Sequence, residues 1–245
     1  MRFAYDLDDE RVATLGVIVL KADETLENDL RRLFPHRDVA LHVTRVSSGA
    51  EVTGETLRAM ADHLTAAAAL FPDPTRFDAV GYGCTSGASV IGPARVARLV
   101  KAGCATQAVT DPVSALVAAC AHLGITRLAI LSPYVEDVSA TLRRVLEAQG
   151  IETPVFGSFD ESREEKVARI APGSIIDAAV SLAGRGGVDG IFLSCTNLRT
   201  LDLVGTIERR TGLPVLSSNL VFAWHLARLA GLRTTELDAR LLTFS

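Results

Sequence analysis

Short apolar runs alternate with longer segments of helical periodicity from residue 12 to residue 230, and this alternation constrains the fold more than any other feature. Several of the runs are almost continuously apolar, as is typical of parallel strands covered by helices on both faces. The pattern therefore predicts an α/β protein built from doubly wound parallel sheets. The predicted strands are residues 12–20, 39–46, 79–83, 105–109, 127–132, 151–157, 190–194 and 214–217. The predicted helices are residues 25–33, 53–70, 93–101, 111–123, 135–148, 174–183, 203–210 and 219–230.

The chain also resembles itself at an offset of about 110 residues. Three pairs of segments match: 15–20 with 128–131, 83–86 with 194–197, and 108–111 with 215–218. The nearly constant offset predicts two similar lobes, residues 1–125 and 126–245, with the last turn of the helix at 219–230 packing back on the first lobe. Such lobes place equivalent strand ends across a cleft. Because ligands of open α/β sheets bind at the carboxyl ends of the strands, we expect the active site in that cleft.

Composition narrows the function classes. The chain has 245 residues and a net charge of −4, and its arginines and lysines are scattered, so we expect no nucleic-acid partner. No apolar run approaches the roughly 20 residues of a membrane span, and the acidic N-terminus lacks an apolar signal segment, so we expect a cytoplasmic protein without a membrane partner. The histidines and cysteines show no metal-ligand spacing, so no metal site is predicted.

Two of the four cysteines carry the strongest functional signal. Cys84 and Cys195 each follow a predicted strand, and each is followed by a threonine and then a small polar residue. A polar turn at a strand end exposes backbone N–H groups that bind a carboxylate and lower the pKa of a cysteine. A buried, inert thiol is the alternative for either cysteine alone, but the same tripeptide type in both lobes favours function. Cys104 and Cys120 lie in apolar settings and are assigned to the core.

These cysteine segments resemble those of the superfamily of aspartate/glutamate racemases, maleate cis–trans isomerases and arylmalonate decarboxylases. The chain is most similar to the maleate isomerase branch and, within it, to the ectoine-utilisation proteins. The resemblance covers nearly the whole chain. Supporting segments are residues 15–20 running into 23–25, residues 132–134 and residues 167–170. It implies the two-lobed fold inferred above, no metal or organic cofactor, and a small carboxylate or amino-acid-like substrate. We also expect a homo-oligomer.

Carried over by position, Cys84 is the isomerase nucleophile and Cys195 its partner acid. An isomerase thiolate adds to a double bond, the central bond rotates and the thiolate leaves, whereas in a racemase one cysteine takes the Cα proton and the other returns one. The resemblance thus implies a cofactor-independent isomerase or racemase. An arylmalonate-type decarboxylase and a non-catalytic small-molecule binding protein are the alternatives. The predicted substrate-binding residues are Asp23, Thr25, Thr85, Ser86, Tyr134, Thr196 and Asn197.

One departure from the family bears on the substrate. Asp23 stands where maleate isomerases have an asparagine that holds a substrate carboxylate. An ionised aspartate in a dry pocket repels a dianion such as maleate and favours a substrate with a cationic nitrogen, such as an amino acid or the amidinium ring of an ectoine. The alternative is that Asp23 caps the helix at 25–33. A second family asparagine, expected just before Val167, has no clear match among residues 162–165.

A dinucleotide-binding loop was the main competing motif. Gly81, Gly83 and Gly87 come close to the glycine pattern of such a loop, and Asp111 follows at a suitable distance. The loop ends the third predicted strand rather than the first, and its counterpart in the second lobe has no glycines. We therefore expect no nicotinamide cofactor.

Overall fold

The computed structural model describes residues 1–7, 12–34, 39–49, 51–234 and 237–243, which contain two four-stranded parallel sheets. The first sheet has the order β2-β1-β3-β4 and the second has the order β6-β5-β7-β8. The identical strand order is the structural form of the sequence repeat. The strands are β1 (Ala13–Leu20), β2 (Val39–Val46), β3 (Phe77–Gly83), β4 (Thr106–Thr110), β5 (Arg127–Ser132), β6 (Glu152–Ser158), β7 (Gly190–Leu193) and β8 (Val215–Ser217).

Helices connect the strands, as the alternation of the sequence requires. In the first half they are α1 (Leu26–Leu33), α2 (Gly54–Ala68), α3 (Thr85–Ile91), α4 (Pro93–Gly103) and α5 (Pro112–Leu123). In the second half they are α6 (Glu136–Glu147), α7 (Glu164–Val167), α8 (Pro172–Ala183), the 3₁₀ turn η1 (Leu201–Leu203), α9 (Val204–Thr211), α10 (Ser218–Leu229) and α11 (Arg240–Thr243). The α/β fold predicted from the sequence is confirmed, and each predicted strand and helix is present to within a few residues.

The sequence missed α3, α7, η1 and α11, which are all short. The omission of α3 matters most because this helix begins directly after Cys84. Its small and polar residues, with Gly87 in the first turn, carry no apolar periodicity. The segment that resembles a dinucleotide loop is therefore the end of a strand running directly into a helix.

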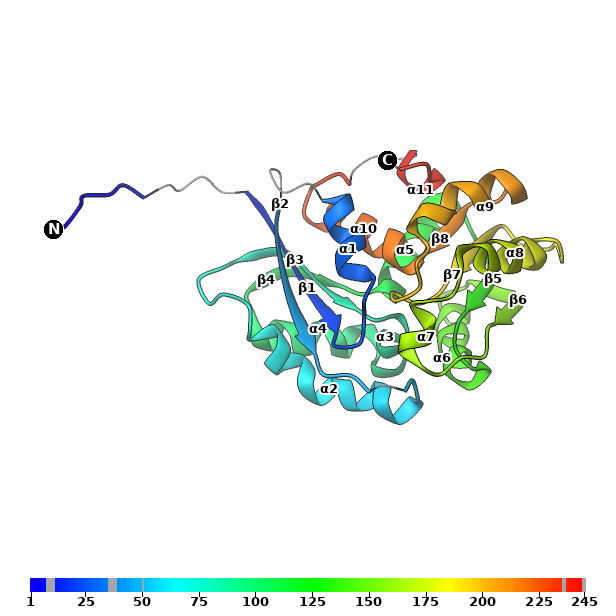
Figure 1. Ribbon diagram of the computed structural model, residues 1–245, viewed down its shortest axis with the longest axis horizontal. Helices are drawn as coiled ribbons and strands as arrows, with labels where there is room; N and C mark the ends of the chain where they lie inside the picture. The colour runs from blue at the N-terminus through cyan, green and yellow to red at the C-terminus, as the bar shows by residue number, and fades with distance from the viewer. Residues whose placement is uncertain (8–11, 35–38, 50, 235–236, 244–245) are drawn as a thin grey trace.

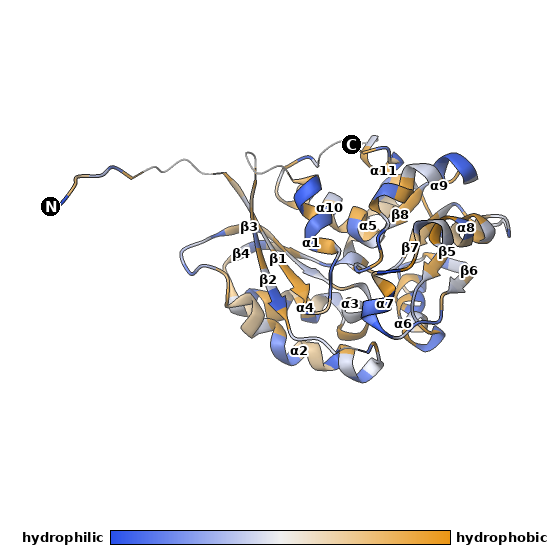
Figure 2. Ribbon diagram, in the orientation of Figure 1, coloured by the Kyte–Doolittle hydropathy of each residue, from blue (hydrophilic) through white to orange (hydrophobic). Residues whose placement is uncertain are grey.

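Figure 1 shows the two sheets side by side, with α3 and α7 between them and α1, α5 and α10 along one side of the junction. In Figure 2 β1, β5 and β7 are largely orange, whereas α1, α2 and α9 carry blue segments. The core thus runs through both sheets and is continuous with the helices at the junction. No helix in the described part of the chain is long and apolar enough to cross a membrane.

Helix α10 follows β8 of the second sheet but packs against α5 and β3 of the first half. A Cβ built on Gly81 of β3 would lie 2.2 Å from the Phe222 ring of α10, so glycine is what allows the helix to approach the strand so closely. The sequence predicts this packing for the last turn of the helix, whereas in the structure the body of the helix makes the contact as well. The division into lobes at residues 125 and 126 remains an interpretation.

The register of the sheets aligns the carboxyl ends of neighbouring strands. Val19 of β1 pairs with Gly83 of β3, so the turns after these strands begin at the same level. In the second sheet Leu131 of β5 pairs with Leu193 of β7 in the same way. The strand order reverses direction at each of these pairs, which is where α/β sheets bind ligands. Residues just after β1, β3, β5 and β7 are therefore placed for a shared site.

Replacing Gly81 with alanine is expected to destabilise the protein by about 1–3 kcal/mol, because the new methyl group overlaps the rigid Phe222 ring. Urea unfolding of both proteins measures the change. Gly173→Ala is the matched control, because a Cβ there meets no atom within 4 Å and should leave stability nearly unchanged. Equal stability of the Gly81→Ala variant and the wild type would contradict the described contact between α10 and β3.

Candidate active site

The turns after β1, β3, β5 and β7 enclose a cavity of about 10 Å³ between the two sheets, room for roughly one water molecule. Both Cys84 and Cys195 line it. Of the substrate-binding residues predicted from the sequence, all except Thr25 line it as well. Leu20 and Glu164, which the sequence did not indicate, also line the cavity. The full lining is Leu20, Asp23, Cys84, Thr85, Ser86, Tyr134, Glu164, Cys195, Thr196 and Asn197.

Cys84 is the N-cap of α3, the residue directly before the helix begins. Its backbone is extended, and its Sγ accepts a hydrogen bond of 3.2 Å from the backbone N–H of Gly87. Glycine at position 87 leaves the room this arrangement needs, because an added Cβ would lie 2.9 Å from Sγ of Cys84 and 2.4 Å from the hydroxyl of Tyr82 and would displace them. The junction of strand and helix thus fixes the thiol at the cavity wall.

Cys195 has an unusual backbone, with φ of +107°. Non-glycine residues rarely adopt this region, at a cost of about 1–3 kcal/mol, and such strain often occurs at functional sites. The N–H of Cys195 donates to Oγ of Ser218, and its Sγ accepts from the N–H of Asn197 at 3.3 Å. The hydroxyl of Tyr134 lies 3.0 Å from the same Sγ. These contacts hold the thiol towards the cavity.

Three hydrogen bonds tie the two cysteine segments to each other, two of them through Ser218. The hydroxyls of Thr85 and Ser218 are 2.8 Å apart, and the N–H of Cys195 also bonds to Ser218. The hydroxyl of Thr196 donates to the carbonyl oxygen of Gly83 at 3.3 Å. The threonine after each cysteine therefore joins the two halves of the site, which gives the repeated Cys-Thr pair a structural role.

Asp23 lies two residues before Thr25, the N-cap of α1, and its carboxylate binds the start of that helix and also lines the cavity. Its Oδ1 accepts from the backbone N–H groups of Thr25 and Leu26, both at 2.8 Å, just before α1. Its Oδ2 is buried and has no hydrogen-bond partner among the described residues. The Thr196 hydroxyl lies near the Asp23 carboxylate and lowers its pKa. The hydrogen bond of that hydroxyl goes to the carbonyl oxygen of Gly83 and not to Oδ2 of Asp23. Burial dominates and raises the pKa of Asp23.

Glu164, at the start of α7, is the residue that the sequence did not single out. Its buried carboxylate accepts from the Tyr134 hydroxyl at 2.7 Å and from Nδ2 of Asn197 at 2.9 Å. It lies in the segment just before Val167 where the family resemblance led us to expect an asparagine. Two adjacent glutamates occupy that segment, and the sequence alone does not show that Glu164 is buried while Glu165 is exposed.

Asn197 and Thr25 are used within the protein. The Oδ1 of Asn197 accepts from the N–H of Glu24, and its Nδ2 donates to the carbonyl oxygen and the carboxylate of Glu164. The hydroxyl of Thr25 donates to the carbonyl oxygen of Asn197 at 2.9 Å. Asn197 therefore reaches the cavity but joins three chain segments, whereas Thr25 lies behind it, outside the cavity lining.

The charge state of the thiols differs from the sequence expectation of lowered pKa values. Burial raises the pKa of Cys84 to about 12 and that of Cys195 well above its usual value. The Gly87 and Asn197 N–H groups do lower these pKa values, but burial and the negative charge of Glu164 outweigh them. Both cysteines are therefore neutral thiols near pH 7. A thiolate forms there only if a positive charge or a proton acceptor compensates it.

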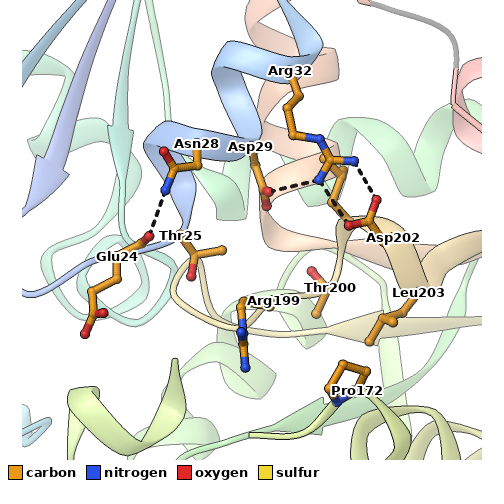
Figure 3. A pocket seen from close by; sticks show the side chains of 11 residues that line it. Glu24, Thr25, Asn28, Asp29, Arg32, Pro172, Arg199, Thr200, Asp202 and Leu203 are labelled. Carbon is orange, nitrogen blue, oxygen red and sulfur yellow. Dashed lines mark hydrogen bonds and ion pairs between the residues drawn. The ribbon is translucent and has the colours of Figure 1, made fainter. Parts of the chain in front are cut away.

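A larger pocket of about 280 Å³ lies on the other side of Thr25 (Figure 3). Arg32 bridges Asp29 of α1 and Asp202 of η1 across it. Oδ2 of Asp29 accepts from Nδ2 of Asn219, which also donates to the carbonyl oxygen of Thr196 next to Cys195. The pocket is separate from the cysteine cavity, but its buried aspartate is linked to the cysteine loop.

Comparison with known proteins assigns the family. The model of the arylmalonate decarboxylase family matches residues 96–242, more than half of the chain. The chain belongs to the arylmalonate decarboxylase family. Arylmalonate decarboxylase of Bordetella bronchiseptica is 34% identical over 110 residues, covering 44% of this chain and 46% of that protein. This match therefore spans less than half the length of that relative.

Maleate isomerases match over nearly their whole length. The enzyme of Alcaligenes faecalis is 24% identical over 240 residues, covering 92% of this chain and 94% of that protein. A solved variant of the Nocardia farcinica maleate cis–trans isomerase, with a covalently bound succinylcysteine intermediate, superposes with a TM-score of 0.81. It is 25% identical and covers 95% of this chain and 98% of its own. The predicted maleate isomerase and arylmalonate decarboxylase superfamily is confirmed, and these matches support an isomerase.

The substitution Asp29→Asn is expected to raise the free energy of unfolding at neutral pH. Burial raises the pKa of Asp29 to about 6, so between about pH 4 and 6 the folded state holds a proton that the unfolded state has lost. Stability therefore falls as pH rises through this window, by up to about 3 kcal/mol from this residue. The amide removes this loss and still accepts from Asn219.

The measurement is urea unfolding at pH 4 and pH 7.5 for the wild type, Asp29→Asn and an exposed control, Asp62→Asn. The difference in stability between the two pH values should shrink only in Asp29→Asn. An undiminished difference would mean that Asp29 ionises without penalty in the folded protein.

Proposed function

We propose that this chain is a two-cysteine isomerase or racemase that uses no cofactor and acts on a small carboxylate carrying a positively charged nitrogen. One observation carries the proposal. Cys84 and Cys195, from equivalent strand ends of the two sheets, line one cavity together with the unpartnered Oδ2 of Asp23. The proposal agrees with the maleate isomerase relatives in using a cysteine and departs from them in the charge of the substrate.

Two thiols on one cavity suit either reaction. A racemase needs an acid and a base on opposite faces of Cα, and an isomerase needs one nucleophile and one group that controls protons. We assign Cys84 as the nucleophile or base of one face and Cys195 as the acid of the other. In the Nocardia farcinica enzyme a succinylcysteine intermediate is seen directly. This supports cysteine chemistry in the family without fixing the substrate here.

The substrate carboxylate has donors at the start of α3. The first N–H groups of a helix have no partner within the helix, so those of Thr85 and Ser86 are available to an anion. The Ser86 side chain lines the cavity beside Cys84. We propose that these groups hold the carboxylate, so that the atom next to it lies between the two sulfurs.

The substrate nitrogen would face Asp23. A buried carboxylate oxygen without a donor is costly, and a ligand ammonium or amidinium group supplies that donor. The same cation offsets the cost of forming a thiolate beside Asp23 and Glu164. A dianion such as maleate would instead add charge to a site that already holds two carboxyl groups. A zwitterionic amino acid, or an amidinium ring such as that of ectoine, fits these constraints.

Decarboxylation is the second candidate, because the family model and the Bordetella bronchiseptica relative both carry that activity in their names. The two reactions differ in a product that is easily measured. A decarboxylase releases CO₂ from a malonate-type substrate, whereas an isomerase or racemase leaves the mass of the substrate unchanged. Assays of both kinds on the same preparation therefore separate the candidates.

Asp23→Asn tests the charge of the substrate. Asparagine keeps the cap of α1, since its side-chain oxygen also accepts from backbone N–H groups. We expect the variant to lose kcat/KM for cationic substrates and to gain it for maleate, changing their ratio by about tenfold or more. The measurement is a panel of maleate, both enantiomers of small amino acids, ectoine and an arylmalonate, followed by NMR and chiral chromatography.

The matched control is Asp111→Asn. Asp111 is also a buried aspartate that caps a helix, accepting from the N–H groups of Val113 and Ser114, but it lies outside the cavity lining. Its substitution should leave the ratio unchanged. An unchanged ratio in Asp23→Asn as well would restrict Asp23 to capping and return maleate to first place among the substrates.

A further inference from the structure

We propose that Glu164 is the internal proton acceptor for Cys195 and that the hydroxyl of Tyr134 carries the proton between them. The inference deepens the proposed function by assigning a proton route to one of its two thiols. It is carried by three buried groups in a line: Sγ of Cys195 lies 3.0 Å from Oη of Tyr134, which lies 2.7 Å from Oε1 of Glu164.

The directions of the two hydrogen bonds follow from the chemistry of the groups. An ionised carboxylate only accepts, so Tyr134 must donate its single proton to Glu164. The Tyr134 oxygen is then left as an acceptor towards Cys195, and the thiol donates to it. The resting arrangement is therefore S–H to O–H to carboxylate, with every proton already aligned for transfer.

The transfer balances without solvent. The S–H bond of Cys195 breaks as a new O–H bond forms on Tyr134, and the original Tyr134 O–H bond breaks as an O–H bond forms on Glu164. The products are a Cys195 thiolate, a neutral tyrosine and a protonated Glu164. The number of negative charges in the cavity does not change. This matters because burial strongly disfavours any added charge there.

The surroundings stabilise both ends of this route. The N–H of Asn197 donates to Sγ of Cys195, and Nδ2 of the same residue donates to Oε2 of Glu164. Tyr134 stays neutral, since burial and its anionic neighbours raise its pKa well above the usual value. The same route run backwards returns a proton to Cys195 after the thiol has protonated a substrate.

Other titratable groups face these residues and must be considered. Asp23, from the turn after β1, raises the pKa values of Glu164 and Cys195, and Cys84 lies across the cavity. Arg45 of β2 donates to the carbonyl oxygen of Asp23 and lowers the pKa of its side chain. None of them contacts both Tyr134 and Cys195 in the described hydrogen bonds. Among the described residues, Glu164 is the carboxylate that accepts from Tyr134 and can therefore take the proton through it.

The route has a distinctive signature that needs no substrate. Below the pKa of an ordinary buried thiol, the thiolate fraction rises tenfold with each unit of increasing pH. Its alkylation rate rises in proportion. A proton shared between Cys195 and Glu164 instead gives a thiolate paired with protonated Glu164, and the fraction of this species is constant between the pKa of Glu164 beside the neutral thiol and its higher pKa beside the thiolate. The alkylation rate of Cys195 should then show a plateau. Opening of the small cavity to the reagent scales every rate by a common factor and does not create a plateau.

The experiment follows iodoacetamide alkylation by mass spectrometry of the Cys195 peptide in full-length Cys84→Ser protein between pH 5 and 10. We expect a plateau in this protein and in the control that also carries Glu165→Gln, since Glu165 is the exposed neighbour of Glu164. Adding Glu164→Gln should replace the plateau with a tenfold rise per pH unit. Half-buried Cys104, whose pKa is raised by burial and by no charged group among the described residues, reports an ordinary thiol in every sample.

Tyr134→Phe, in the same Cys84→Ser protein, provides a second test if Glu164→Gln fails to fold by circular dichroism. Removing the bridging hydroxyl takes away the donor to the Cys195 thiolate and should lower the plateau rate by about tenfold. A tenfold rise per pH unit in the parent protein, or a plateau that neither substitution changes, would overturn the route. Because the assay uses no substrate, these results stand apart from the proposed function, which fails separately if no small carboxylate is isomerised, racemised or exchanged.

Discussion

Two thiols and two carboxyl groups share one cavity that is almost closed to water, and the electrostatic cost of this arrangement governs the rest of the site. Burial raises the pKa values of Asp23, Glu164, Cys84 and Cys195 together. Each additional negative charge is therefore resisted by the others. A reaction that needs a thiolate must either import a cation with the substrate or move an existing charge, and the geometry offers both: the free oxygen of Asp23 and the hydrogen-bonded pair of Glu164 and Tyr134.

The fold builds this cavity from its repeat. In each sheet two neighbouring strands end at the same level. One strand end of each pair contributes a cysteine to the cavity and the other a polar residue: Cys84 with Asp23, and Cys195 with Tyr134. Ser218 and the threonines after the cysteines tie the halves together. The halves are not chemically equivalent: among the described residues, the tyrosine beside Cys195 is hydrogen-bonded to a glutamate, whereas Tyr82 beside Cys84 donates to Sδ of Met60. That asymmetry suits two thiols with different tasks.

The sequence predicted the strands, the longer helices and the two cysteines because each depends on local signals, namely apolar periodicity and a repeated tripeptide at strand ends. It did not predict α3, whose glycine and serines give no periodic pattern, or the burial of Glu164 in preference to its neighbour Glu165. It also gave the wrong direction for the pKa shifts of the cysteines. The N–H groups that lower them are local, whereas the burial that raises them comes from strands and helices distant in sequence.

The central claim is that both cysteines act on the same substrate from opposite sides, and the incorporation of solvent deuterium tests it most directly. With a chiral amino acid as substrate in D₂O, the wild type is predicted to invert and label it, whereas Cys84→Ala and Cys195→Ala each lose inversion by at least about a hundredfold. Cys104→Ala, outside the cavity, should retain full activity. Inversion at the wild-type rate in either single-cysteine variant would contradict the two-cysteine account.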